Sequence, residues 1–477
     1  MRPNRLAALA LGFGLALGSA LGAAALPLEA PGQPAASAAA AALAAAPAST
    51  DAAAENAASA SAPLGLEEAK SLALARSAAV RQALLAVDEA VLAERLESYS
   101  FLPSLSVDAG GKYAYGSSAS GAVAASAGVG IAQPLYDGGR SALRKAIDAA
   151  ATGMARESVR SAVSSLEAEV ESAYFGVLEA EAALEAAKSD LESSSLHLGL
   201  ATAKYEASAL SRPDLLEVES EAATAEAAFV KARREVSLSR AALASLTGLP
   251  SGTALAGVDA ARYDQAARGL ALASDEAVSA AASRLAAAAA ESDPETASAA
   301  LASGKAAASV KLAERAWLPG VSAGYSHTVP LGAGESLGLG SGSLSVSASL
   351  SLDFWTKKAG LESARLAAGK AAIGLEEAKR KAALGVESAA YDCAALARSL
   401  VASAKALEHA ESRLEAVREL FALSAASSAE LSDAEALAGS ARKALVAARF
   451  GFISSLSGLG RLAGLEDEEL LIAALRG

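Results

Sequence analysis

The stretch SLSVSASLSL, residues 343–352, alternates serine with an apolar residue along its whole length. Successive side chains of a β-strand point to opposite faces, so this stretch would have one polar face and one apolar face. It also has about the length, roughly 9–11 residues, of a strand that crosses a bilayer at a tilt. We therefore predict a strand with one wet face and one apolar face.

A second alternating pattern occupies residues 104–135. Its first strand would carry Leu105, Val107, Ala109 and Tyr113 on one face, and Ser106, Asp108 and Lys112 on the other. Glycine-containing segments interrupt both patterns, as expected for the turns between strands. We expect two β-hairpins, 104–135 and 320–352, and hence four strands per chain.

The chain is duplicated with a shift of 216 residues. The shift relates Pro103 to Pro319, Asp214 to Glu430 and Gly248 to Gly464. Each half reads helix, two strands, very long helix, break and helix, and in the first half we expect one helix over residues 66–99 that Pro103 ends. The predicted divisions are a first repeat at 64–250, a connecting segment at 251–268, a second repeat at 269–470 and a C-terminal tail at 471–477.

Apolar residues recur every seven positions in the two long helical segments. The first stripe contains Val163, Val170, Val177, Leu184, Leu191 and Leu198, and the second contains Val386, Cys393, Leu400, Leu407, Leu414 and Phe421. Heptads of this length predict left-handed coiled-coil packing. A helix of roughly 70 residues would be about 100 Å long, which is more than a compact domain requires.

The N-terminal segment is typical of an export signal. Arg2 and Arg5 precede an apolar run, and small residues follow up to Ala25. We predict a signal peptide at 1–25 and, because residues 26–63 are nearly all Ala, Pro, Ser and Gly, a disordered linker there. No later stretch has the ~20 apolar residues of a membrane helix, so strands would have to span any membrane.

Composition excludes several classes of protein. The net charge of −13 argues against nucleic-acid binding, and the single cysteine excludes a disulfide framework. No acid–base or nucleophile cluster is found, so we predict no enzyme activity, no cofactor and no metal site. His197, His409 and Cys393 are better explained as packed or surface residues of the helices than as ligands.

Four strands in one chain cannot close into a barrel, and lipid does not tolerate open sheet edges. Another copy of the chain would therefore have to pair with the edge strands. The strand count allows two, three or four copies, and a small water-soluble sheet packed beside the helices is the alternative. Three copies would give twelve strands, which is within the range of outer-membrane barrels.

Several segments resemble the outer-membrane efflux proteins, the TolC-like channels. The segment QPLYDGGR, residues 133–140, is similar to the strand-to-helix junction of that family, and residues 173–178, 204–218 and 242–250 resemble its long helix, its periplasmic turn and the end of its first half. The resemblance extends over about residues 64–470. One departure is the second junction, LDFWTKK at 352–358, which lacks the glycine pair.

The resemblance implies a mainly α-helical homotrimer that resides in the outer membrane and extends into the periplasm. A twelve-stranded β-barrel would continue into a long coiled-coil α-helical barrel, and a periplasmic adaptor and an inner-membrane pump would dock on it. The function implied is passive conduction in a tripartite efflux or type I secretion system. A secreted trimeric coiled-coil surface protein is the alternative, but such a stalk has no reason to carry two strand pairs in register.

The resemblance also implies where the periplasmic site lies. The helices turn back near 208–213 and 424–428, where Ser208, Ala209, Ser424 and Ala425 replace the glycines of the family's adaptor-contact turns. Glu430 and Asp433 lie on one helix face and, with Asp214, match the acids that narrow the closed entrance. Solvated acids on an exposed turn are the alternative explanation.

Overall fold

The fold is described from a computed structural model for residues 63–116, 119–331, 340–423 and 425–464. The predicted signal peptide and C-terminal tail lie outside these residues, as does the predicted linker apart from Pro63. Parts of the two expected interstrand turns, 117–118 and 332–339, also lie outside them.

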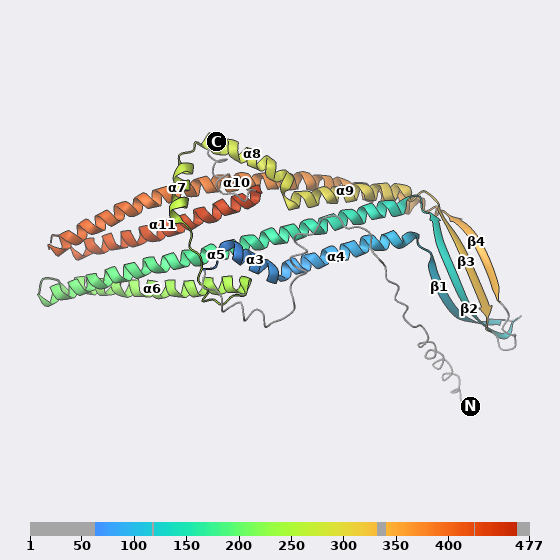
Figure 1. Ribbon diagram of the computed structural model, residues 1–477, viewed down its shortest axis with the longest axis horizontal. Coiled ribbons are helices and arrows are strands. Elements are labelled where there is room, and N and C mark those ends of the chain that lie inside the picture. The colour runs from blue at the N-terminus through green and yellow to red at the C-terminus, as the bar shows by residue number, and fades with distance from the viewer. Residues whose placement is uncertain (1–62, 117–118, 332–339, 424, 465–477) are drawn as a thin grey trace, which may run out of the picture. The chain divides into compact units, whose positions relative to one another are not determined.

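From the strands onward each half has the predicted order of two strands, a long helix, a break and a helix, whereas more than one helix precedes the strands (Figure 1). The first half contains α3 (Leu66–Arg76), α4 (Ala78–Ser98), the short 3₁₀ helix η2 (Tyr99–Phe101), β1 (Ser104–Gly116), β2 (Ala119–Tyr136), α5 (Arg140–Glu206) and α6 (Arg212–Thr247). The rest contains α7 (Ala260–Ala271), α8 (Asp275–Ser292), α9 (Pro294–Arg315), β3 (Gly320–Pro330), β4 (Ser341–Ser349), α10 (Phe354–Ala422) and α11 (Ser428–Ala463). Of the helices described, none is both long and apolar enough to cross a membrane.

The helix expected over residues 66–99 is in fact two helices, so that prediction is wrong. The hydroxyl of Ser77 accepts a hydrogen bond from the backbone N–H of Val80 and caps the start of α4. Serine favours such caps because its oxygen satisfies an amide that has no partner within the helix. Next to this break, Arg76 donates to the carbonyl of Gly248, which connects α3 to the end of α6.

The strands form one antiparallel sheet in the order β1-β2-β3-β4. One row across it consists of Leu105, Ile131, Tyr325 and Leu344, and the next row consists of Ser106, Gly130, Ser326 and Ser343. Neighbouring rows point to opposite faces, so the sheet is apolar on one face and polar on the other. The Ser326 and Ser343 hydroxyls lie 2.9 Å apart and hydrogen-bond on the polar face.

The two halves match closely where helices α6 and α11 are compared. Both have 36 residues, and the start of α11 is shifted by 216 positions from the start of α6. Each helix ends at a glycine with a φ of +68°, Gly248 in the first half and Gly464 in the second. Glycine is favoured there because the left-handed conformation strains other residues.

The junction between β2 and α5 explains the motif QPLYDGGR. Gly138 and Gly139 have φ values of +74° and +73°. The carboxylate of Asp137 accepts hydrogen bonds from the N–H groups of Gly139 and Ser141, at 2.8 and 2.6 Å. Burial alone would raise the pKa of Asp137, but these N–H groups outweigh it and lower the pKa. Arg315 of α9 donates to the carbonyls of both glycines and so connects the second half to this junction.

The second junction is built differently. Phe354 and Trp355 occupy the positions that correspond to the two glycines, and α10 begins at Phe354, two positions earlier than α5 in its half. Asp353 precedes the helix, and its side chain makes no capping hydrogen bond. The departure from the glycine motif therefore corresponds to an earlier helix start.

The buried stripe of α10 largely follows the predicted heptads. Five of its six residues are buried and Leu407 is half-buried. In α5 only Val170 and Val177 of the predicted stripe are buried, whereas Leu184, Leu191 and Leu198 are half-buried. Beyond Val177 the buried small residues form another series seven positions apart, namely Ala180, Ala187, Ser194 and Ala201, and Leu178 and His197 are buried as well. Small side chains let neighbouring helices approach closely, and the leucines flank this contact.

Helices from both halves meet around one buried carboxylate. Glu171 of α5 lies 2.9 Å from Lys70 of α3 and 2.9 Å from Arg461 of α11, and it accepts a hydrogen bond from Ser457 at 2.8 Å. The burial of Glu171 is compatible with its charge because two cations and a hydroxyl surround it.

We expect Gly139→Ala to destabilise the protein by about 2 kcal/mol. A left-handed conformation costs an L-residue roughly 1–2 kcal/mol, and the new Cβ would lie 2.1 Å from Nη1 of Arg315. Thermal unfolding followed by circular dichroism measures the effect. Gly176→Ala is the control, because its Cβ would meet no atom within 4 Å and alanine favours a helix by about 1 kcal/mol. Equal melting temperatures for the two variants would show that the junction does not require glycine at position 139.

Candidate functional site

The two helical turns lie at the ends of α5 and α10 away from the sheet (Figure 1). Because α5 has 67 residues and rises about 1.5 Å per residue, its turn is about 100 Å along the helix from the strands. Ser208 has a φ of +57°, and no other non-glycine residue among those described has a positive φ. Its N–H bonds to the carbonyl of Tyr205, and the N–H of Ala209 bonds to that of Lys204. This is the Schellman pattern, in which glycine usually occupies the position of Ser208.

The second turn repeats one of these bonds 216 residues later. The N–H of Ala425 donates to the carbonyl of Leu420 at 2.8 Å. Ser424, which corresponds to Ser208, lies outside the described residues. Ser208, Ala209 and Ala425 are exposed at the turns. Their contact with an adaptor remains a prediction.

Two of the three predicted gate acids lie in the first turn of a helix and bond to its N-cap serine. Asp214 accepts a hydrogen bond from the hydroxyl of Ser211 at 2.7 Å, at the start of α6. Glu430 accepts from the backbone N–H of Ser427 at 2.8 Å, and its own N–H donates to the Ser427 hydroxyl. The backbone N–H of Ser427, together with its hydroxyl, lowers the pKa of Glu430. We did not predict this capping box from the sequence, although a Ser and a Glu three residues apart are its usual signal.

Asp433 differs from Glu430. It is exposed and makes no hydrogen bond or ion pair with the part of the chain that the structure describes. Asp433 lies three positions after Glu430, so the two acids share one face of α11. Beside the second turn, α11 therefore carries one carboxylate that caps the helix and one that has no bonding partner among the described residues.

A mixed aromatic and cationic contact joins the halves just behind the turns. Lys204 of α5 donates to the carbonyl of Phe421 in α10 at 2.7 Å, and its ammonium lies 3.5 Å from the centre of the Phe421 ring. His197 packs edge-on against the same ring, with 5.3 Å between centroids. It is 2% exposed, and neither ring nitrogen has a hydrogen-bond partner among the described residues.

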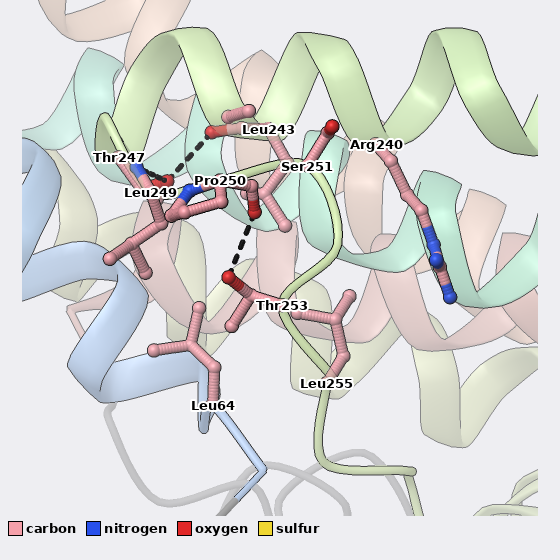
Figure 2. A pocket seen from close by; sticks show the side chains of 10 residues that line it. Leu64, Arg240, Leu243, Thr247, Leu249, Pro250, Ser251, Thr253 and Leu255 are labelled. Carbon is pink, nitrogen blue, oxygen red and sulfur yellow. Dashed lines mark hydrogen bonds between the residues drawn. The ribbon is translucent and has the colours of Figure 1, made fainter. Parts of the chain in front are cut away.

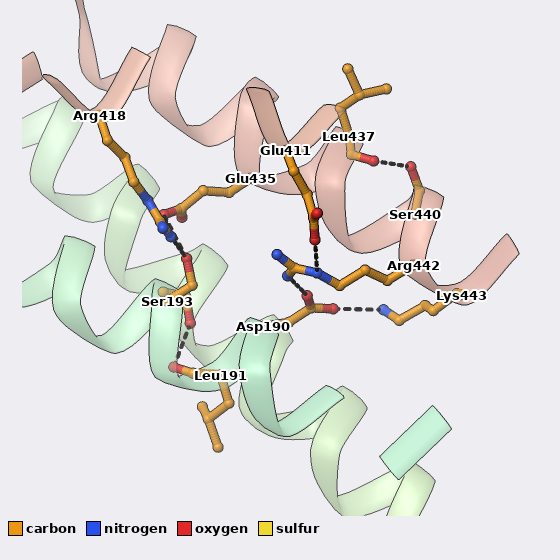
Figure 3. A network of polar contacts seen from close by, with 11 residues as sticks. Asp190, Leu191, Ser193, Glu411, Arg418, Glu435, Leu437, Ser440, Arg442 and Lys443 are labelled. Carbon is orange, nitrogen blue, oxygen red and sulfur yellow. Dashed lines mark hydrogen bonds and ion pairs between the residues drawn. The ribbon is translucent and has the colours of Figure 1, made fainter. Parts of the chain in front are cut away.

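A network of charged side chains continues this contact (Figure 3). Glu435 of α11 accepts from the Ser193 hydroxyl at 2.8 Å and pairs with Arg418 of α10 at 3.3 Å, and Nδ1 of His197 is 3.6 Å away. Burial alone would raise the pKa of Glu435, but the His197 ring and the Ser193 hydroxyl outweigh it and lower the pKa. These contacts hold the C-terminal part of α5 to α10 and α11.

A second group in the same network surrounds Asp190 of α5 (Figure 3). Its carboxylate lies 3.2 Å from Arg442 and 3.3 Å from Lys443, both on α11, and Arg442 also contacts Glu411 of α10. A Cβ on Gly439 would lie 2.9 Å from the Asp190 carboxylate. Glycine at 439 therefore leaves room for the ion pairs between the two halves.

The pocket in Figure 2 is a structural feature rather than a ligand site. Its wall is mostly aliphatic, with Leu64, Leu243, Leu249, Pro250 and Leu255 among the lining residues. Its threonines bond to nearby backbone carbonyls, and Arg240 pairs with Glu181. Among the described residues there is no group of three side chains that could hold a metal ion. Burial raises the pKa of the Cys393 thiol to about 12, so this side chain is an unreactive part of the core.

The comparisons with known proteins agree with this architecture. The family model described as outer membrane efflux protein matches residues 69–249 and 285–465. The chain belongs to the outer membrane efflux protein family. The two matched segments are shifted by 216 residues, so each half of the duplication matches the family separately. Members of this family are outer-membrane transport proteins and not enzymes.

Solved structures of efflux channels have the same fold. The CusC channel has 18% sequence identity and a TM-score of 0.71, with 86% of this chain and 92% of that chain covered. The CmeC outer membrane channel of Campylobacter jejuni has 15% identity and a TM-score of 0.71, with 86% and 89% covered. The open state of the MtrE outer membrane channel of Neisseria gonorrhoeae has 22% identity and a TM-score of 0.67, with 84% and 89% covered. No curated protein sequence matches this chain.

We call the contacts of Glu435 with Ser193, His197 and Arg418 the polar seam, and we expect this seam to weaken in acid. Because the folded pKa lies below the ordinary value of 4.5, the stability from the ionised carboxylate is fully present above about pH 4.5. It is lost as the pH falls through the lower folded value. Glu435→Gln should cost about 1–3 kcal/mol at pH 7 and should flatten the fall of the melting temperature below pH 4.5.

Melting curves from pH 7 to pH 3 test this expectation. Glu411→Gln is the control, because Glu411 is half-exposed and such pairs contribute about 1 kcal/mol or less. Parallel pH profiles for wild type and Glu435→Gln would show that Glu435 does not stabilise the seam.

Proposed function

We propose that three copies of this chain form an outer-membrane channel that conducts substrates from the periplasm to the exterior. The observation that carries this proposal is the four-stranded sheet, because β1 and β4 each pair on one side only within the described residues. Unpaired edge amides and carbonyls are not tolerated in lipid. Three copies would supply twelve strands and leave no edge, and this number is within the range of outer-membrane barrels.

The exposed side chains of the sheet support a lipid-facing surface. Val107 is 76% exposed and Leu344 is 81% exposed, and both lie on the apolar face. At the junction with α10, Trp355 is 88% exposed, and Lys357 lies over the ring of Trp317. Aromatic residues beside an apolar band are typical of the interface between a membrane and water.

Exposed apolar stripes on the helices support contacts between copies. On α4 the stripe contains Leu85, Leu92 and Leu96, and on α10 it contains Leu366, Ile373 and Leu384. The spacings of four, seven and eleven residues keep each stripe on one helix face. Burial of these stripes between copies would remove apolar surface from water, and the joined helices would continue the barrel as a tunnel through the periplasm.

Membership of the efflux family supports a proposal about partners. We propose that a periplasmic adaptor contacts the turns at Ser208, Ala209, Ser424 and Ala425, and that an inner-membrane pump supplies the energy. Residues 1–25 would direct export, residues 26–63 would be a linker, and the repeats at 64–250 and 269–470 would each form half of a protomer. A wide duct selects weakly, so the pump would determine the substrate.

The assembly can be tested by native mass spectrometry of the detergent-extracted protein. We expect a trimer of the processed chain in the outer-membrane fraction. A monodisperse monomer, or a chain that stays soluble without detergent, would contradict the channel and would favour a secreted surface protein.

We further propose that Glu430 and Asp433 form a cation-attracting ring at the periplasmic entrance, with Asp214 near the other turn. Three copies would bring six carboxylates of α11 together, and rings of acids favour cations. Capping fixes the Glu430 carboxylate, whereas Asp433 is free to face ions. We therefore expect Asp433→Asn to reduce cation selectivity and block by multivalent cations more than Glu430→Gln does.

Single-channel recording in planar bilayers measures both quantities. Glu276→Gln is the control, because it removes one charge from an exposed position at the start of α8. If Asp433→Asn leaves selectivity and block unchanged, the ring is not part of the entrance.

A further inference from the structure

The polar face of the sheet carries one acid. Asp108 is the only Asp or Glu in the four described strands, and the row through it continues with Gly128, Thr328 and Ser341. The neighbouring row on the same face is made of serines and a glycine. The polar face is therefore neutral around Asp108.

Glycines across the strand pair make room for the polar side chains of β1. A Cβ on Gly128 would lie 2.8 Å from Oδ2 of Asp108, and a Cβ on Gly130 would lie 2.7 Å from the hydroxyl of Ser106. The side chains of Asp108 and Ser106 therefore lie across β2. A larger residue in place of Gly128 or Gly130 would displace these side chains. The Asp108 carboxylate therefore lies against the backbone of β2 rather than extending away from the sheet.

Asp108 has no counter-charge among the described side chains. It is exposed and makes no hydrogen bond or ion pair with the residues that the structure describes. Lys112 lies four residues farther along β1, which is about 13 Å of strand at roughly 3.3 Å per residue. An ionised carboxylate without a partner is stable only where water solvates it, so this position fits a water-filled lumen.

We infer that Asp108 is a second determinant of ion selectivity, inside the barrel and separate from the periplasmic entrance. The inference rests on the proposed trimeric channel, in which symmetry would place three Asp108 carboxylates at one level of the lumen. At 0.1 M salt their field extends about 10 Å from each charge, so it acts on ions that pass through the barrel. The neutral serines around them do not cancel this field.

The test is the reversal potential of single channels under a potassium chloride gradient in planar bilayers. The background is Asp214→Asn/Glu430→Gln/Asp433→Asn, so that the proposed acids of the entrance do not contribute. In this background, Asp108→Asn should lower the cation-to-anion permeability ratio by about twofold at 0.1 M salt. The loss should be smaller at 1 M, where the screening length is about 3 Å.

Two further variants separate position from charge. Glu276→Gln removes one charge from an exposed position at the start of α8, and it should leave the ratio unchanged. Asp108→Asn/Ser326→Asp returns the acid to the same face of the sheet, and it should restore cation preference.

The outcomes distinguish the inference from the proposed function. An unchanged ratio for Asp108→Asn with normal conductance would overturn the role of Asp108 and leave the channel intact. An equal loss for Glu276→Gln would also overturn it, because the effect would then follow net charge alone. A wild type that forms no conducting pore would overturn the proposed channel and this inference with it.

Discussion

The open edges of the sheet are the constraint on which the rest of the structure depends. Strands β1 and β4 leave backbone amides and carbonyls unpaired on their outer sides within the described residues. In water such edges favour uncontrolled association, and in lipid they are not tolerated. The apolar face adds a second requirement, because a surface that includes Val107 and Leu344 is unfavourable in water. A closed assembly of copies satisfies both requirements together, and this is why the channel proposal starts from the strands.

The two halves of the duplication share one fold but differ at local positions. Helices α6 and α11 correspond residue by residue and end in the same left-handed glycine. The strand-to-helix junctions differ, because Gly138 and Gly139 allow a turn that Phe354 and Trp355 replace with an earlier helix start. Arg315 shows that the copies are not independent, since it comes from the second half and satisfies carbonyls of the first.

Near the two turns, residues that stabilise the helices also belong to the proposed periplasmic entrance or lie directly behind it. The Glu430 carboxylate caps α11, so its orientation is fixed by the helix it stabilises. Behind the turns, Lys204, Glu435 and Asp190 connect α5 to the second half through partly buried charges. Charges in such positions tolerate few arrangements, because each must keep its partners when the helices move. Any opening at this end would have to exchange these contacts for others.

Short-range patterns were sufficient to predict the strands and the long helices. Alternation with period two predicted the strands, heptads predicted the long helices, and the 216-residue shift predicted two equivalent halves, because each depends only on residues close in sequence or on repetition. The break at Ser77 carried a weak local signal and was missed. The shift of the buried stripe of α5 from leucines to Ala187, Ser194 and Ala201 could not be predicted, because it depends on which neighbouring helices surround α5. The contacts of Glu435 with Ser193, and of Arg315 with Gly139, join residues far apart in the chain. Such residues come together only when the helices pack with a particular rotation and register. The tertiary structure therefore decided which polar contacts join the two halves, whereas the sequence determined the strands and long helices that these contacts connect.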